Sequence, residues 1–326
     1  MRILIVKLGA LGDVINTFPL AVALKDHLAA EIHWLVAPLS APFVSAHPCV
    51  DQTVVFDKKG GIRAAFRVAG LLRKTRYDGV LDLQRILKSA LFTQAVRADR
   101  RIGFDPDRCK EMTAFFPFER IPAGDPGDHM ARQYMEFSAY LGLPSAPIAW
   151  RMPPAASACP LRPQTPYAIL NVGATKVANR WFPDRFAELA AGIQKTFGWE
   201  VVLTGGPEDR PMAAAIMAAS DTCVPVNTVG ETRLPELQHL IEGAQAVVSC
   251  DTGPMHLAVA LGRPVFALFG PADPRRTGPL NGVVIRKAVP CSPCGRKTCN
   301  QKRVYCMEAV LPEDVLAAMT DCYQRK

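Results

Sequence analysis

The sequence predicts an α/β protein built from two doubly wound parallel-sheet domains of the Rossmann-like kind. Short, fully apolar runs alternate with stretches that have the apolar period of a helix, which indicates βαβ units. This alternation stops at residues 151–166, a segment with five prolines and no periodicity, and then starts again. At 326 residues the chain is also long enough for two domains of about 150 residues each.

The first domain, residues 1–150, is expected to open with a buried strand over residues 2–8 and a helix over residues 14–29. Strands and helices then alternate until a helix over residues 129–142 closes this half. The strands expected between them lie at residues 31–37, 52–56 and 79–83, and the helices at 63–75 and 87–96.

The second domain, residues 167–326, repeats the alternation and ends in a helix over residues 311–321 that could pack on either half. Its expected strands lie at 167–172, 199–204, 245–249 and 264–269, and its helices at 183–197, 210–219, 233–243 and 254–261. The two halves, joined by the linker 151–166, are expected to face a central cleft, because doubly wound sheets bind ligands at the carboxyl ends of their strands.

Composition indicates a soluble globular protein, since 49% of the residues are hydrophobic and 21% are charged. No apolar run reaches the roughly 18 residues that a membrane span needs. The apolar block at the N-terminus lacks the length and the cleavage site of a signal peptide. Cysteines without framework spacing are then expected to be mostly reduced, and the protein to be cytoplasmic.

Positive charge is concentrated in residues 58–110, which carry fourteen Lys and Arg against five Asp and Glu, whereas the whole chain has a net charge of +8. Such a block can be simply a solvated face. Its concentration also fits an anionic partner, either a phosphorylated lipid surface, an acidic sugar or nucleic acid. Nucleic acid is the least expected of the three, because no recognition motif accompanies the block.

A second informative segment begins at Ser249, where an expected buried strand gives way to Asp251-Thr252-Gly253-Pro254 and an apolar helix. Asp251 and Thr252 are expected to cap this helix, whose first N–H groups and positive dipole end would suit phosphate. The Asp251 carboxylate would accept hydrogen bonds from sugar hydroxyls. The alternative is a helix cap with no ligand.

The first expected strand runs into Gly9-Ala10-Leu11-Gly12-Asp13. Two glycines in a strand-to-helix turn are typical of dinucleotide sites, but the G-x-G-x-x-G spacing is absent and the second strand ends without an acidic residue. An NAD site is therefore not expected. Asp13 would lie at the mouth of the crevice, where a carboxylate can act as a general base.

Four motifs together resemble glycosyltransferase family 9, the bacterial heptosyltransferases of lipopolysaccharide core assembly. They are Lys7 to Asp13, Asp82-Leu83-Gln84 with Leu87-Lys88-Ser89, Gly230 to Leu234, and Asp251 to His256 with Phe269-Gly270-Pro271. The resemblance implies a GT-B fold and an inverting transfer that needs no metal or other cofactor. It further implies ADP-heptose as donor and a Kdo-lipid A or inner-core lipopolysaccharide acceptor, reached from the inner membrane face as a peripheral protein.

Site residues follow from the same resemblance. Asp13 matches the catalytic base, Asp251 the residue that holds the donor sugar, and Thr252 with Gly253 the diphosphate contacts. The remaining donor-binding candidates are Thr175, Lys176, Arg180, Thr232 and His256. Acceptor-binding candidates, from the motifs and the basic block, are Gly12, Arg63, Arg67, Gln84 and Lys88.

The chain departs from the family pattern at Asn179, where members commonly have a lysine two residues before the tryptophan. Lys176 or Arg180 could supply that charge. A GT-B transferase or epimerase acting on another nucleotide sugar, or a nucleotide-binding protein without catalysis, remains as an alternative function.

Four cysteines gather near the C-terminus, at Cys291, Cys294, Cys299 and Cys306. Their spacing is compatible with a structural zinc or iron–sulfur site but lacks the paired C-x-x-C of the strongest signals. An unmetallated loop and a disulfide clip are the other interpretations.

Overall fold

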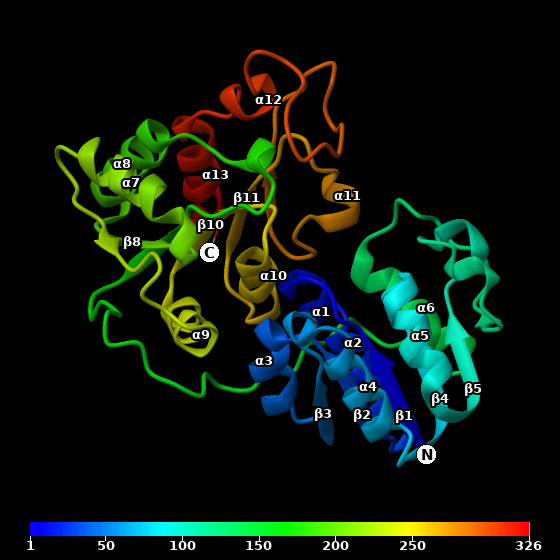
Figure 1. Cartoon of the computed structure of the whole chain (residues 1–326). Coiled ribbons are helices and arrows are strands. Elements are labelled where there is room, and N and C mark those ends of the chain that lie inside the picture. Colours follow the sequence, from blue (N-terminus) through cyan, green and yellow to red (C-terminus); the bar gives the residue numbers. More distant parts are fainter. Residues whose placement is uncertain (326) are drawn as a thin grey trace. The chain divides into compact units, whose positions relative to one another are not determined.

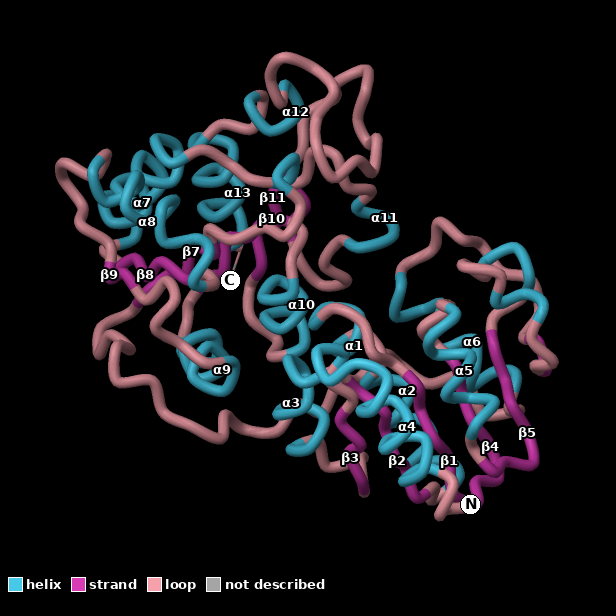
Figure 2. The backbone as a smooth tube through the Cα atoms, viewed as in Figure 1, coloured by secondary structure: helices cyan, strands magenta, loops and turns pink. Residues whose placement is uncertain are grey.

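The computed structural model describes residues 1–325 and divides the chain into two compact units, Met1–Pro153 and Pro154–Lys326. Each unit contains one six-stranded sheet in which all strands run parallel (Figures 1 and 2). The predicted pair of doubly wound sheets is therefore confirmed. Over residues 1–325, no helix combines the length and the apolar character that crossing a membrane would require.

The first sheet has the strand order β3-β2-β1-β4-β5-β6. Its chain runs outward from β1 to β3 and then returns to β4, so β1 and β4 flank the topological switch point. Val6 pairs with Asp82 at the ends of these two strands, which brings the segments that follow them together. The strands are β1 (Arg2–Val6), β2 (Glu31–Val36), β3 (Gln52–Val55), β4 (Arg76–Asp82), β5 (Arg97–Gly103) and β6 (Glu119–Arg120).

Helices cover both faces of this sheet. Ala64 and Val68 of α4 and Phe92 of α5 share one core with Leu4 and Val80 of the strands. On the other face, as right-handed crossovers require, α2 packs against α6. The helices are α1 (Leu11–Ile15), α2 (Phe18–Leu28), α3 (Ala41–Ala46), α4 (Gly61–Leu72), α5 (Leu87–Ala95) and α6 (Met130–Tyr140).

The second sheet repeats the plan with the order β12-β11-β10-β7-β8-β9 and a switch point between β7 and β10. Its strands are β7 (Tyr167–Asn171), β8 (Glu200–Thr204), β9 (Val226–Asn227), β10 (Ala246–Cys250), β11 (Val265–Leu268) and β12 (Val283–Ile285). Its helices are α7 (Pro183–Phe197), α8 (Arg210–Ala218), α9 (Leu234–Gly243), α10 (Gly253–Ala260), α11 (Pro274–Thr277), α12 (Tyr305–Glu308) and α13 (Pro312–Gln324).

The closing helix α13 packs on the second unit, against α7, β11 and β12. Tyr323 lies edge-on to Trp199 at 4.9 Å between ring centroids, and its hydroxyl donates to the carbonyl of Gln245 at 2.5 Å. The sequence left open which half the closing helix packs on, and these contacts show that it packs on the second unit.

Two parts of the first unit differ from the sequence prediction. The helix expected over residues 14–29 is two helices, α1 and α2, because Pro19 starts a new helix and the Thr17 hydroxyl donates to the Asp13 carbonyl at 2.8 Å. Strand β5 was not predicted at all, since four of its seven residues are charged and three are exposed. A polar sequence forms a strand here because both neighbours pair with it.

The proline-rich segment 151–166 contains no helix or strand in the described chain, yet it is hydrogen-bonded along its length. Arg151 forms two hydrogen bonds to the Asp26 carboxylate at 2.6 and 2.7 Å. The Ala155 amide donates to Glu242 at 2.9 Å, and the Cys159 amide to His239 at 3.0 Å. The boundary between the compact units, at Pro153 and Pro154, lies between these two sets of contacts.

Candidate functional site

The switch point of the first sheet joins two of the family motifs. Because Val6 and Asp82 pair in register, Leu8 and Gln84 emerge side by side, and the Leu8 amide donates to Gln84 Oε1 at 3.0 Å. A Cβ on Gly9 would lie 3.0 Å from that oxygen and 3.1 Å from Asp13 Oδ2. Glycine is therefore needed here for the close approach of backbone to both side chains.

Asp13 lies in α1 with its side chain 38% exposed, and both of its carboxylate oxygens contact other side chains. Lys7 Nζ lies 3.3 Å from Oδ2, and the Tyr134 hydroxyl lies 3.5 Å from Oδ1. A carboxylate that is fixed by two groups and still reaches solvent is suited to accept a proton from a bound hydroxyl.

Lys7 is the unusual member of this group, because its side chain is only 2% exposed. Its ammonium group lies 4.9 Å above the buried Tyr134 ring and donates to the Leu83 carbonyl at 3.4 Å. Burial lowers the pKa of Lys7, whereas the negative charge of Asp13 acts in the opposite direction. An unpaired buried ammonium would be costly, so Asp13 and the Tyr134 ring are what make this position tolerable.

Asp82 is also buried, and its hydrogen bonds fix the loop that follows β4. Its Oδ1 accepts from the amides of Gln84 at 3.0 Å and Arg85 at 3.3 Å, and its Oδ2 from the Thr93 hydroxyl at 3.3 Å. Burial raises the pKa of Asp82, against the effect of these hydrogen bonds. The loop that carries Gln84 is thereby fixed, with Arg85 in a left-handed conformation at φ 63°.

The acceptor-binding candidates fall into two places. Gly12 and Gln84 lie beside Asp13, at the end of β1 and β4. Arg63 and Arg67 lie on the exposed face of α4, and Lys88 lies exposed on α5 with Nζ 5.7 Å from the Phe56 ring centre. The structure thus joins the first two to the candidate base and leaves the three cations on the outer surface of the same unit.

The basic block is not one uniform surface. Several of its cations are committed to internal partners: Arg76 to Asp99, Arg100 to Glu119, and Arg108 to Asp105 and Glu136. Nine others form no ion pair within residues 1–325. Six of them lie on α4 or the turns that flank it, namely Lys58, Lys59, Arg63, Arg67, Arg73 and Lys74, and the other three are Lys88, Arg97 and Arg101. The charge that remains for a partner is therefore centred on α4 and the turn before it.

The second unit places the donor candidates at the end of β7 and β10. Thr252 is the N-cap residue of α10, but its side chain does not cap the helix, so that prediction is wrong for Thr252. Its hydroxyl is engaged behind the helix instead, 3.0 Å from the Ser249 hydroxyl and 3.2 Å from Asn171 Nδ2. The Thr252 side chain thus makes no hydrogen bond to the start of α10, where Gly253 and the half-buried Asp251 lie.

The two cations that could replace the lysine missing at Asn179 have different surroundings. Arg180 is paired with the buried Asp209, at 3.2 Å, and also donates to the Ala174 carbonyl. Lys176 is half-buried and has no ion pair within the described part of the chain, while Thr175 beside it is exposed. Asn179 itself is buried. Lys176 is therefore the better placed of the two for a phosphate.

The remaining donor candidates are Thr232, on the loop after β9, and His256, in α10. Thr232 follows Gly230, whose amide donates to Gly205 at the end of β8 at 3.0 Å. His256 is buried within α10. Strand β7 thus leads into Thr175, Lys176 and Arg180, strand β10 leads into Asp251 and α10, and Thr232 follows β9.

The four clustered cysteines do not fit a metal site as they stand. Cys291 and Cys294 are exposed, Cys306 is buried, and the Cys299 thiol lies 3.5 Å from the Arg303 carbonyl. Within residues 1–325 no group of three or more His, Cys, Asp or Glu side chains is arranged to hold an ion. All ten cysteines are free thiols in this structure. A structural metal therefore stays a prediction from spacing alone.

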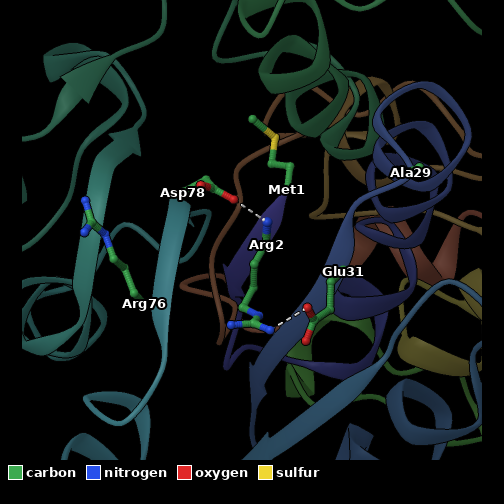
Figure 3. A pocket seen from close by; sticks show the side chains of 6 residues that line it. All are labelled: Met1, Arg2, Ala29, Glu31, Arg76 and Asp78. Atoms are coloured by element: carbon green, nitrogen blue, oxygen red, sulfur yellow. Dashed lines mark hydrogen bonds and ion pairs between the residues drawn. The ribbon is translucent and has the colours of Figure 1, made fainter.

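A hollow of about 510 Å³ in the first unit lies at the starts of β1, β2 and β4, at the edge of the sheet opposite Asp13 (Figure 3). It does not offer a second candidate site. Its charged groups are satisfied by one another, since Arg2 pairs with Glu31 at 2.7 Å and the Arg2 amide donates to Asp78 at 2.6 Å. Arg76 points away from both, toward Asp99.

Sequence reasoning missed Lys7 and Tyr134 as site residues. Lys7 carried a signal, because a lysine that directly follows a fully apolar strand must be buried with a partner. Tyr134 carried none, since it comes from α6 and only the fold brings it to Asp13.

Comparison with known proteins agrees with the motifs. Residues 65–305 match the family described as glycosyltransferase family 9 (heptosyltransferase). Lipopolysaccharide heptosyltransferase 1 of Pseudomonas aeruginosa is 30% identical over 318 residues, covering 92% of this chain and 87% of that protein. A family 9 glycosyl transferase structure from Veillonella parvula has a TM-score of 0.84 at 22% identity, with 100% and 98% coverage. E. coli heptosyltransferase WaaC with ADP has a TM-score of 0.77 at 22% identity, with 99% and 98% coverage, and both structures share this chain's fold.

Proposed function

Because the chain belongs to glycosyltransferase family 9, the heptosyltransferase family, we propose that it transfers heptose from ADP-heptose to a Kdo-lipid A or inner-core lipopolysaccharide acceptor. The name of the Pseudomonas relative supports the sugar and the acceptor, and the ADP bound in the E. coli structure supports the nucleotide. Such an acceptor is a lipid, so the protein would work at the inner membrane face, on its cytoplasmic side.

The observation that carries the proposal is the Asp13 carboxylate, which contacts Lys7 and Tyr134 while its side chain stays 38% exposed. In an inverting transfer, Asp13 takes the proton from the acceptor hydroxyl as that oxygen bonds to the anomeric carbon of the donor. The bond from this carbon to the diphosphate breaks on the opposite face, and ADP leaves with the electron pair. All groups used are side chains and backbone of the protein, so the proposed mechanism uses no metal.

Lys7 is proposed as a positioning residue. A cation 3.3 Å away favours the ionised form of the Asp13 carboxylate, and the Tyr134 ring holds that cation in place. Asp13 would therefore be ready to accept a proton in the resting enzyme, with its orientation fixed before the acceptor arrives.

The second unit is proposed to bind the donor. The start of α10 at Thr252 and Gly253 offers backbone N–H groups and a positive dipole end to the diphosphate, and Lys176 supplies a positive charge. Asp251 would accept hydrogen bonds from the heptose hydroxyls. Thr175, Arg180, Thr232 and His256 complete the proposed donor contacts, with Arg180 acting mainly through Asp209.

The deciding experiment offers the purified protein ADP-heptose, ADP-glucose and UDP-glucose with Kdo-lipid A and follows the acceptor mass. We expect one heptose to be added from ADP-heptose alone, and Asp13→Asn to slow the addition by a factor of roughly 10²–10⁴. Transfer from UDP-glucose in preference, epimerised sugar nucleotide without acceptor, or turnover by Asp13→Asn at the wild-type rate would overturn the proposal.

A further inference from the structure

The first unit exposes an unusual amount of apolar surface beside its uncommitted cations. Ile62 and Phe66, one turn apart on α4, are each 72% exposed. Leu87 and Leu91, one turn apart on α5, are also exposed. Large side chains of this kind are normally scattered singly on a soluble protein, so two adjacent pairs need an explanation.

These residues form one surface with a regular arrangement, hereafter the α4–α5 surface, made by Ile62, Phe66, Leu87 and Leu91 with Arg63, Arg67 and Lys88. The helices α4 and α5 pack against each other on one face of the sheet (Figure 1). On α4, the row Ile62–Phe66 runs next to the row Arg63–Arg67, because residues four apart stack on a helix. On α5, Leu87 and Leu91 form a similar apolar row, with Lys88 exposed beside Leu87.

The same helices are well anchored on their inner side. Ala64, Val68 and Leu72 of α4 are buried against the sheet, as is Phe92 of α5. Ile62 and Phe66 are thus additional apolar residues on the outer face of α4, because the inner face of this helix is already packed in the core. An outer face that mixes large apolar and basic side chains suits a membrane interface, where apolar groups enter the acyl region and cations pair with anionic headgroups.

The loop after β5 extends this surface. Phe115 is 82% exposed, although its loop is held firmly, since Arg120 donates to the carbonyls of Thr113 at 2.8 Å and Phe116 at 2.8 Å. The loop reaches the start of α5, where the Leu87 amide donates to Glu111 at 3.1 Å. Phe115 is therefore presented outward by a fixed backbone, next to the first turn of α5.

The position of this surface relative to Asp13 follows from the topology. Each helix of a parallel sheet starts where the preceding strand ends, so Ile62 in the first turn of α4 and Leu87 in the first turn of α5 lie toward the edge that carries Gln84 and Asp13. A lipid whose headgroup reached Asp13 would have its acyl chains near these side chains.

We propose that the α4–α5 surface docks this protein on an anionic lipid bilayer, with Ile62 and Phe66 inserted among the acyl chains and Arg63 and Arg67 paired with lipid phosphates. The inference rests on the proposed function, which makes the acceptor a lipid. The cations without ion pairs on and around α4 give the charge that an anionic leaflet would complement, and the exposed apolar pairs give what a water-soluble acidic sugar would not need.

The test measures co-sedimentation of the full-length protein with vesicles of phosphatidylglycerol and phosphatidylcholine, at low and at physiological salt. We expect Ile62→Ser combined with Phe66→Ser to weaken binding at least tenfold at both salt concentrations. Arg63→Gln with Arg67→Gln should weaken it mainly at low salt, because screening already removes that contribution at high salt. Leu39→Ser, another exposed leucine of this unit, on the β2–α3 connection, is the matched control and should bind like the wild type.

Wild-type binding that is absent, or equal in the serine double variant, would overturn the proposal, as would an equal loss in Leu39→Ser. Transfer to a deacylated, water-soluble acceptor separates this inference from the proposed function. The serine double variant should match the wild type in that assay. If the wild type transfers nothing there but still binds vesicles through Ile62 and Phe66, the proposed function fails and the docking surface stands.

Discussion

The two units share one topology and yet place opposite chemistry at its switch point. In the first, the chain leaving β1 and the end of β4 carry ionisable groups, Lys7 and Asp82, both buried. In the second, β7 and β10 end in neutral groups that bond to one another, with Asn171 Nδ2 3.2 Å from the Ser249 hydroxyl. The Thr204 hydroxyl at the end of β8 extends this neutral network to Asn171 Oδ1 at 3.4 Å.

The difference between the two sets of strand-end residues fits the different ligands proposed for the two units. A base must be ionised before its substrate arrives, and a buried cation beside it favours that state at the cost of desolvating two charges. A diphosphate brings its own negative charge, so oriented N–H groups at a helix start suffice and no buried counter-charge is needed. Similar Rossmann-like frames can therefore serve a proton acceptor and an anion site by changing only the residues at the strand ends.

The largest expected effect is on kcat, when the candidate base of the first unit is removed. Asp13→Asn keeps the shape of the side chain but removes the proton acceptor, so kcat should fall roughly 10²–10⁴-fold with ADP binding unchanged. Steady-state kinetics and ADP titration measure the two quantities. Asp26→Asn, which removes a remote carboxylate of the same unit, is the control and should retain wild-type kcat.

Loss of the buried cation should have the next largest effect. Lys7→Met fills the space but leaves Asp13 without its charged neighbour, and we expect kcat to fall about 10- to 100-fold, because a displaced base works poorly. Lys7→Arg, which keeps the charge, should recover part of the loss. If Lys7→Met turns over within twofold of the wild type, Lys7 is a structural residue only.

Most of the fold could be predicted because parallel strands buried on both faces leave unmistakable apolar runs. The helix α7 was predicted with its observed bounds, since Pro183 opens it and Gly198 ends it. The misses have two causes: β5 is mostly charged, and β6, β9 and β12 are only two or three residues long, too short for a periodic pattern.

The candidate site was less predictable for a different reason. Sequence motifs indicated Asp13, Gln84 and Thr252, but a side chain's partners depend on contacts between distant segments. The Thr252 hydroxyl binds Ser249 and Asn171 rather than its own helix, because β7 and β10 are neighbours only in the folded sheet. The roles of these residues stay predictions until the variants are measured.

A moderate effect is expected at the second switch point. Asp251→Ala should weaken ADP-heptose binding and lower kcat, each about tenfold, while ADP itself binds as before, because only sugar contacts are lost. Thr252→Val should weaken ADP and ADP-heptose alike, since it disturbs the start of α10. Isothermal titration with both ligands distinguishes the two, and equal losses of ADP binding in both variants would contradict the assignment of Asp251 to the sugar.

The smallest effect concerns stability, where the two ends should differ in their response to pH. Burial lowers the pKa of Lys7 in the folded state, so between that lowered pKa and the ordinary value of 10.5 the unfolded chain binds more protons. Stability therefore rises with pH across this window, because the cost of burying the ammonium disappears as it loses its proton. Urea unfolding of wild type and Lys7→Met from pH 8 to 11 should show a free-energy difference that shifts in favour of the wild type as pH rises. The matched variant of the neutral end, Thr252→Val, should show a difference from wild type that does not change over the same range. A pH-independent difference for Lys7→Met would mean that the pKa of Lys7 is the same in the folded and the unfolded chain, and the contrast between the two strand ends would lose its electrostatic basis.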